Sequence, residues 1–153
     1  MTSAASQPMA DAGGRYQMIL NGEIYNYREL RTRLEGLGHA FRSASDTEVL
    51  LQSYLRWGRD CVPQLRGQFA FVIYDARERK LFAARDRAGE KPLFYQHGER
   101  GLAFASELKA ILPMPGMTRR MNAEALDHYL AYGYVPGGLC LLEGIRKLPP
   151  AHT

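Results

Sequence analysis

The chain has 153 residues, a hydrophobic content of 46% and a charged content of 24%, which is the composition of an ordinary globular domain. A chain of this length can bury roughly two-thirds of its unfolded surface in one complete domain. No apolar run approaches the ~20 residues of a membrane-spanning helix, and the amino terminus lacks the basic flank and apolar core of a secretory signal. Neither membrane insertion nor secretion is expected, and the predicted compartment is the cytoplasm.

Charge and cysteine content exclude further classes. Twenty Lys and Arg against 16 Asp and Glu give a net charge of +4, but the arginines are spread singly along the sequence, so no nucleic-acid partner is predicted. Cys61 and Cys140 lie far apart, with no CxxC spacing and no histidine at metal-ligand spacing. Neither a metal site nor a disulfide framework is predicted, and both thiols are expected to be buried.

The first predicted element after a polar start is a strand. Residues 1–14 are rich in Ala, Ser, Gly and Asp without periodicity, and are predicted to form a flexible leader. Residues 16–20 are predicted to be a strand that ends in a tight turn at Asn21-Gly22. Helical spacing of apolar residues from position 27 then predicts a helix that Gly38 ends, with Asn26 as its cap and Glu29 three residues later.

A second helix is predicted from Asp46 to Gly58, with Asp46 as the N-cap and the first turn facing solvent or a ligand. Two antiparallel hairpins follow, one pairing residues 69–74 with 80–84 and one pairing 92–96 with 101–105. Prolines 113 and 115 break the chain before a capped helix over residues 122–130.

Two charged groups are predicted to be structural. Arg85-Asp86-Arg87, with Lys91, is expected to form a salt-bridged corner that fixes a hairpin. Glu107 and Lys109 are expected to belong to a solvated helix start.

Polar residues gather at two places where a core pattern does not require them. Asn21, Gly22 and Glu23 follow an apolar run, and Asp46 precedes the second helix. Such side chains and bare backbone amides suit the binding of a small polar ligand. The purely structural alternatives are that Asn21-Gly22 is only a turn pair and that Asp46 is only a helix cap worth ~1 kcal/mol.

These segments resemble a known family. Residues 20–27 and 45–49 resemble the glutamine-binding parts of the class II glutamine amidotransferase domain of glutamine-hydrolysing asparagine synthetases. The likeness continues through residues 66–71, 85–95, 104–110 and 144–152. It implies an α+β fold of the N-terminal-nucleophile type, an αββα sandwich of two antiparallel sheets between helices.

The resemblance also implies roles for the polar residues. Asn21 and Gly22 would supply the side-chain amide and backbone N–H of an oxyanion hole, where one donor is typically worth ~3 kcal/mol. Glu23 and Asp46 would bind the α-ammonium group of glutamine. No histidine base is implied, and no metal site.

The family's nucleophile is an amino-terminal cysteine, and its arginine clamp for the substrate carboxylate precedes the position of Gly14. This chain begins Met1-Thr2, so it is expected to be a family member without its first strands. The expected domains are a leader over 1–14, a partial amidotransferase domain over 15–112, and an exit helix and linker over 113–153 toward an absent synthetase domain. ATP and Mg²⁺ are expected only in that synthetase domain, so no cofactor is predicted here.

The implied function is glutamine binding for a glutaminase that supplies ammonia for amide transfer to aspartate. The chain alone is expected to be inactive, to bind glutamine weakly and to self-associate through exposed sheet edges and apolar faces. Its other expected partners are a synthetase domain or a full-length homologue.

Three alternatives remain open. Thr2 could act as an N-terminal nucleophile after removal of the first methionine. The chain could instead be a non-catalytic interaction or amino-acid-sensing module, or the glutaminase domain of another class II amidotransferase. The amide acceptor of the parent enzyme is also open.

Overall fold

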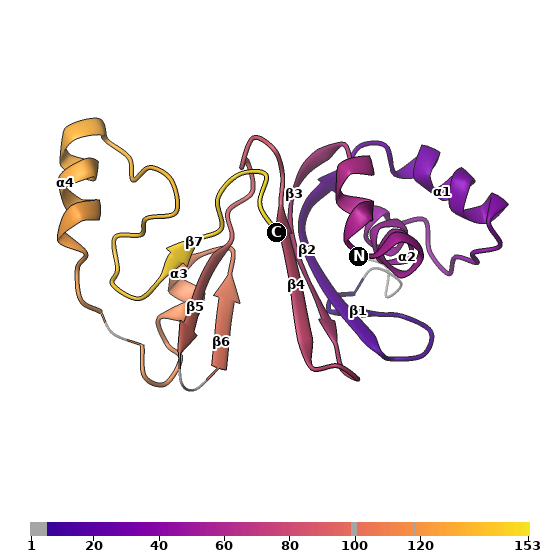
Figure 1. Cartoon of the computed structure of the whole chain (residues 1–153), viewed down its shortest axis with the longest axis horizontal. Coiled ribbons are helices and arrows are strands. Elements are labelled where there is room, and N and C mark those ends of the chain that lie inside the picture. The colour runs from indigo at the N-terminus through magenta and orange to yellow at the C-terminus, as the bar shows by residue number, and fades with distance from the viewer. Residues whose placement is uncertain (1–5, 99–100, 118) are drawn as a thin grey trace.

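The computed structural model describes residues 6–98, 101–117 and 119–153. Two antiparallel sheets lie face to face, one with the strand order β1-β2-β3-β4 and the other with the order β6-β5-β7 (Figure 1). The strands of the first sheet are β1 (Met9–Ala10), β2 (Tyr16–Ile24), β3 (Gly67–Asp75) and β4 (Lys80–Arg85). Those of the second sheet are β5 (Phe94–Gly98), β6 (Gly101–Ala105) and β7 (Arg146–Lys147).

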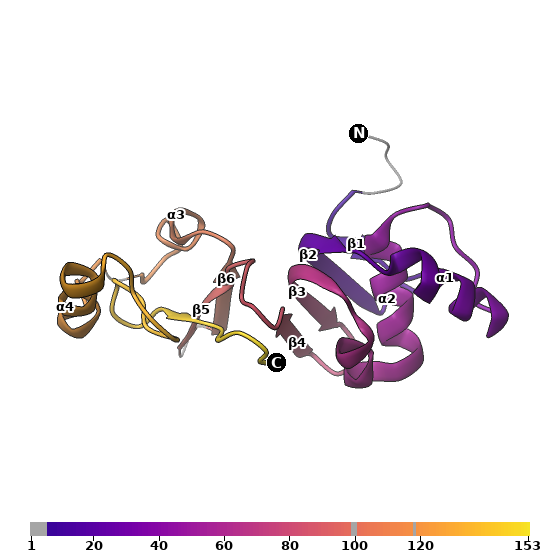
Figure 2. The same cartoon turned by 90° about the horizontal axis from the view of Figure 1, so that it is seen from above.

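Helices lie on the outer faces of the two sheets. Helices α1 (Tyr27–Gly36) and α2 (Asp46–Trp57), followed by a 3-10 helix at Gly58–Gln64, cover the first sheet (Figure 2). The short α3 (Leu108–Ile111) packs on the second sheet, and α4 (Ala123–Tyr132) lies at the end of the molecule farthest from α1 and α2. The arrangement is the predicted α+β sandwich of two antiparallel sheets between helices.

The main core lies between the first sheet and its two helices. Alternate residues of β2 and β3 face the helices, among them Met18, Phe69 and Phe71, and meet Leu34 of α1 and Leu50 of α2. A smaller cluster joins the sheets, where Ala70 and Val72 of β3 meet Leu93 and Phe104. The period of two along a strand explains why one face of β3 contacts the helices and the other contacts the second sheet.

Most predicted elements are confirmed. The two hairpins form with β3 paired to β4 and β5 paired to β6. Helix α2 ends at Gly58, and Asn122 caps α4 by accepting a 3.2 Å hydrogen bond from the N–H of Ala125. Glu107 and Lys109 lie exposed at the start of α3, as expected, and form an ion pair with a distance of 2.6 Å.

The predicted leader over 1–14 is wrong for residues 6–14, and residues 1–5 lie outside the described residues. Met9 pairs with Met18 and joins the main core. The side-chain amide of Gln7 accepts from the N–H of Leu20 at 2.7 Å and donates to its carbonyl at 3.0 Å. The order of this segment comes from contacts with a strand further along the chain, so local composition did not reveal it.

Two predicted helix caps are also wrong. Asn26 makes no side-chain cap; its amide group donates to Gln64 and accepts from the N–H of Arg66, which ties α1 to the start of β3. The cap of α2 is Ser45, whose hydroxyl accepts from the N–H of Glu48 at 3.2 Å. In the first turn of α2, which was expected to face solvent or a ligand, Thr47 and Glu48 are buried.

The corner at residues 85–91 forms, but the prediction that salt bridges hold it is wrong, because its charged side chains bind backbone groups instead. Asp86 is buried and accepts from the backbone N–H groups of Phe69, Glu90 and Lys91. The Arg85 guanidinium donates to the carbonyls of Lys91 at 2.7 Å and Leu148 at 2.6 Å. Backbone groups of an irregular corner need partners, and these two charged side chains supply them.

Candidate functional site

Strand β2 runs straight through the segment that was predicted to turn. Asn21, Gly22 and Glu23 pair with Ala70, Phe69 and Gln68 of β3. The predicted turn at Asn21-Gly22 is therefore wrong, because long-range pairing with β3 outweighs the local turn preference of an Asn-Gly pair. The three polar residues lie in a rigid strand.

Gly22 is required where β2 and β3 approach each other. Its φ is +140°, and a Cβ built there would lie 2.1 Å from the carbonyl oxygen of Gln68. A Cβ built at Gly67 would likewise lie 2.1 Å from the carbonyl oxygen of Glu23. Two side chains are thus excluded at this end of the sheet, which leaves the backbone of Gly22 exposed.

The strand register indicates that the N–H of Gly22 points away from β3. Antiparallel pairs alternate between bonded and non-bonded, so N–H groups two residues apart point to the same side of a strand. The N–H groups of Leu20 and Ile24 both point to the free side of β2, where Gln7 and Asp46 accept from them. Gly22 lies between these two, and Phe69 opposite it exchanges its backbone hydrogen bonds with Asp86 instead.

Asp46 reaches the same edge of β2 from the start of α2. Its Oδ2 accepts from the N–H of Ile24 at 3.0 Å, and its Oδ1 lies 3.4 Å from the Thr47 hydroxyl. The carboxylate therefore lies next to the exposed Glu23. The fold brings Asp46 to the end of the strand that carries Asn21, Gly22 and Glu23, although Asp46 is separated from them by more than 20 residues.

Asn21 lies on the other face of β2, toward the second sheet. It lines a cavity of about 230 Å³ together with Gln7, Leu93 and Ser106. The cavity is bordered by strands of both sheets and is otherwise largely apolar. A small polar group held beside Asn21 would be partly shielded from water.

Sequence reasoning missed a buried carboxylate next to this site. Glu48 accepts from the N–H of Arg42 at 2.8 Å, from the N–H of Ser43 at 2.6 Å and from the Ser43 hydroxyl at 2.6 Å. Burial alone would raise the pKa of Glu48, but these hydrogen bonds and the Arg31 charge outweigh it and leave the pKa below its ordinary value. The capping-box spacing of Ser45 and Glu48 was a sequence signal for this network.

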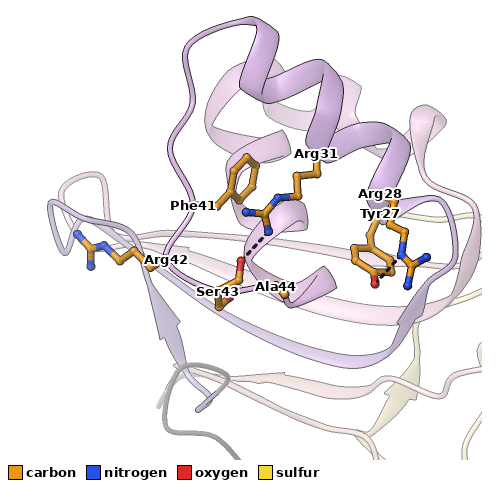
Figure 3. A pocket seen from close by; sticks show the side chains of 7 residues that line it. All are labelled: Tyr27, Arg28, Arg31, Phe41, Arg42, Ser43 and Ala44. Atoms are coloured by element: carbon orange, nitrogen blue, oxygen red, sulfur yellow. Dashed lines mark hydrogen bonds between the residues drawn. The ribbon is translucent and has the colours of Figure 1, made fainter.

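Arginines line a shallow pocket of about 510 Å³ between α1 and residues 41–44 (Figure 3). Arg31 points toward Ser43 and donates to its carbonyl at 2.7 Å. Arg28 folds back onto Tyr27, and Arg42 points away from both. Because the three guanidinium groups do not converge, the pocket does not form an anion site.

Within the described residues, no group of three His, Cys, Asp or Glu side chains is placed to hold a metal ion. Likewise, no helix in that part of the chain is long and apolar enough to cross a membrane. Both described cysteines are buried and free.

The fold and the site define a domain in which two antiparallel sheets present a glycine-bearing strand edge and two carboxylates. The family model of the glutamine amidotransferase domain matches residues 1–153, and the chain belongs to this family. This chain matches glutamine-hydrolysing asparagine synthetases over part of their length. It is 45% identical over 151 residues to asparagine synthetase [glutamine-hydrolyzing] 3 of Bacillus subtilis strain 168, covering 96% of this chain and 24% of that protein.

Two further relatives match most of the chain. A putative glutamine-hydrolysing asparagine synthetase of Mycobacterium tuberculosis H37Rv is 42% identical over 142 residues, covering 90% of this chain and 22% of that protein. The amidase chry2 of Gibberella zeae is 35% identical over 152 residues, covering 99% of this chain and 22% of that protein. The chain thus spans about a quarter of the length of the curated relatives that it matches.

Solved structures show the same fold. Glutamine phosphoribosylpyrophosphate amidotransferase of B. subtilis, in complex with ADP and GMP, aligns with a TM-score of 0.59 at 29% identity. The alignment covers 69% of this chain and 25% of that protein. The predicted N-terminal-nucleophile fold class is confirmed.

Proposed function

We propose that this chain is the glutamine-binding part of a glutaminase that converts glutamine to glutamate and ammonia for amide transfer to aspartate. The carrying observation is the free edge of β2, where the N–H of Gly22 points outward next to Ile24, whose own N–H is bound by Asp46. An outward N–H on a rigid strand is a preorganised hydrogen-bond donor. The membership of the chain in the amidotransferase family supports the choice of glutamine.

In this proposal the four residues have separate roles. When a nucleophile attacks the glutamine amide carbon, negative charge develops on the amide oxygen, and the Asn21 side chain and the Gly22 N–H donate to it. Glu23 and Asp46 accept from the α-ammonium group of the substrate. One Asp46 oxygen accepts from the Ile24 N–H, and the other, which lies 3.4 Å from the Thr47 hydroxyl, keeps a lone pair for the substrate.

The nucleophile is assigned to a group outside the described residues. Cys61 and Cys140 are both buried, and burial raises the pKa of the Cys61 thiol to about 12, so neither is a suitable attacking thiolate. The chain alone is expected to hydrolyse no glutamine and to bind it weakly. Thr2 as an N-terminal nucleophile stays an alternative prediction, because residues 1–5 lie outside the described residues.

Glutamine titration of the ¹⁵N-labelled chain followed by NMR tests the binding function. Resonances of Gly22, Glu23 and Asp46 are expected to shift at millimolar glutamine. Asp46→Asn keeps an oxygen for Ile24 but loses the charge, and should weaken binding by about tenfold. Asp60→Asn, which removes an exposed charge on the 3-10 helix, is the matched control. Shifts spread over the surface, or equal affinity in both variants, would refute the assignment.

Activity is tested separately. Glutaminase assays compare the chain alone, the chain with an added amino-terminal segment of a longer relative, and Thr2→Ala. Activity only after the addition supports the proposal. Activity in the chain alone that Thr2→Ala abolishes would replace it by the Thr2 alternative.

A role as an interaction module has one observation in its favour. Helix α4 and the residues after it expose four large side chains, Tyr129, Leu130, Tyr132 and Tyr134. Exposed apolar surface of this extent is typical of contacts with another protein. The proposed partners are a synthetase domain, a full-length homologue or a second copy of this chain.

A further inference from the structure

The segment between α1 and α2 is locked by a closed ring of hydrogen bonds. The Ser43 hydroxyl lies 2.6 Å from a Glu48 oxygen and 2.9 Å from the Ser45 hydroxyl, and the Ser45 hydroxyl accepts from the N–H of Glu48 at 3.2 Å. Glu48 lies in the first turn of α2, so these hydrogen bonds join the helix to the segment that precedes it.

The charge of Glu48 decides which group donates and which accepts in each hydrogen bond of the ring. Its hydrogen bonds and the nearby Arg31 keep Glu48 ionised, and an ionised carboxylate only accepts hydrogen bonds. The Ser43 hydroxyl must then donate to Glu48, which leaves its oxygen to accept from the Ser45 hydroxyl. The Ser45 hydroxyl in turn accepts from the Glu48 N–H. The Ser43 proton therefore binds Glu48, and the Ser45 proton binds the Ser43 oxygen.

Arg31 secures the segment from the side of α1. Its Nη1 donates to the Ser43 carbonyl at 2.7 Å, and its guanidinium lies 4.5 Å from the centre of the Phe41 ring (Figure 3). Its Nε donates to Glu35 at 2.8 Å. Residues 41–45 are thus held from two helices. Asp46 is the next residue along the chain, so these contacts restrict the position of its backbone.

We propose that Glu48, acting through Ser43 and Ser45, is a positioning residue that aims the Asp46 carboxylate at the Ile24 N–H and the free edge of β2. Glu48 accepts from backbone groups of the preceding segment, whereas Asp46 reaches β2, so the two carboxylates have different partners. An effect of Glu48 on glutamine binding rests on the proposed function. The positioning of the Asp46 carboxylate does not depend on it.

The test measures amide hydrogen exchange of Ile24 relative to amides at the centre of β3. Glu48→Gln replaces one carboxylate oxygen by an NH₂ group that cannot accept from the backbone N–H groups of Arg42 and Ser43. Ser43→Ala removes only the hydroxyl group that links Glu48 to Ser45. Both are expected to speed Ile24 exchange by about tenfold relative to β3, because the Asp46 hydrogen bond is loosened. Ser43→Thr, which keeps the hydroxyl, should restore the slow exchange.

The matched control is Asp75→Asn. Asp75 is also a buried, hydrogen-bonded carboxylate, but it pairs with Tyr16 at the opposite end of β2. It should lower overall stability without changing the ratio of Ile24 to β3 exchange. If the ring only adds stability, the Glu48 and Ser43 variants should also lose stability without a change in the ratio of Ile24 to β3 exchange. That result would overturn the inference.

Glutamine affinity, measured on the same variants, separates this inference from the proposed function. A loss of affinity that follows the Ile24 exchange ratio supports both. If the wild-type chain binds no glutamine while Ile24 still responds to Ser43→Ala and Ser43→Thr, the positioning stands and the proposed function fails. If glutamine binds but the Ile24 exchange ratio is unchanged in the Glu48 and Ser43 variants, the proposed function stands and the positioning role is wrong.

Discussion

The carboxylate of Asp46 accepts a hydrogen bond from the backbone N–H of Ile24 at 3.0 Å. This bond joins the start of α2 to the end of β2, and it satisfies a backbone donor that the pairing with β3 leaves free. A helix start and a strand edge that are distant in sequence thereby become one site.

Gly22 should tolerate no side chain. Gly22→Ala would place a Cβ 2.1 Å from the Gln68 carbonyl oxygen at a φ of +140°, and is expected to lower the free energy of unfolding by about 2–4 kcal/mol. Urea unfolding measures the effect. Gly36→Ala is the control, since its Cβ would meet nothing within 4 Å in α1, and it should be neutral or slightly stabilising.

The core between α1 and the first sheet should be sensitive to cavities. Leu34 is fully buried, whereas Leu37 just after the helix is 48% exposed. Leu34→Ala is expected to cost about 2–5 kcal/mol of unfolding free energy, and Leu37→Ala less than about 1 kcal/mol. Equal losses in urea unfolding would contradict the placement of α1.

The protein should lose stability in acid. Burial alone would raise the pKa of Asp86, but backbone hydrogen bonds from Glu90, Lys91 and Phe69 hold it below its ordinary value, and the Glu48 pKa is lowered as well. Because the unfolded chain then binds protons first, this stabilisation is fully present above about pH 5 and is lost as the pH falls through the lowered pKa values.

Urea unfolding at several pH values between 7 and 3 measures this dependence. Asp86→Asn should flatten the slope as well as reduce stability at neutral pH. A slope that the substitution leaves unchanged would mean that other carboxylates dominate the acid response.

Neither described cysteine should react in the native protein. Cys61 and Cys140 are buried, and the pKa of the Cys61 thiol is raised to about 12, so little thiolate forms at pH 8. A thiol reagent should label both side chains only after urea is added. Rapid labelling of Cys61 without denaturant would show that the 3-10 helix opens readily.

The chain should self-associate. Ile19 and Leu81 expose apolar surface on the first sheet, and Leu130 and Tyr132 do so on α4. Multi-angle light scattering is expected to show a dimer or larger species at high concentration, and Leu130→Glu should shift it toward monomer if α4 forms the contact. A clean monomer throughout would leave these surfaces to a different partner.

Local patterns were enough to predict both hairpins, the extent of α2 and the capped helix α4. These elements depend on the spacing of apolar residues and on glycines or prolines at their ends, and both are properties of a short stretch of chain. The same applies to the choice of Asn21, Gly22, Glu23 and Asp46 as notable polar residues, while their roles stay predictions.

The sequence by itself therefore determined the elements and the residue types at the site, because backbone periodicity and end signals act over a few residues. Only the tertiary structure decided that β2 continues through Asn21-Gly22, that Gln7 and Met9 contact β2, and that Asp46 binds Ile24. Each of these features is a hydrogen bond or strand pair between distant segments. Such contacts form only when a backbone donor left open by one element meets an acceptor supplied by another, and that meeting is set by the packing of the whole fold.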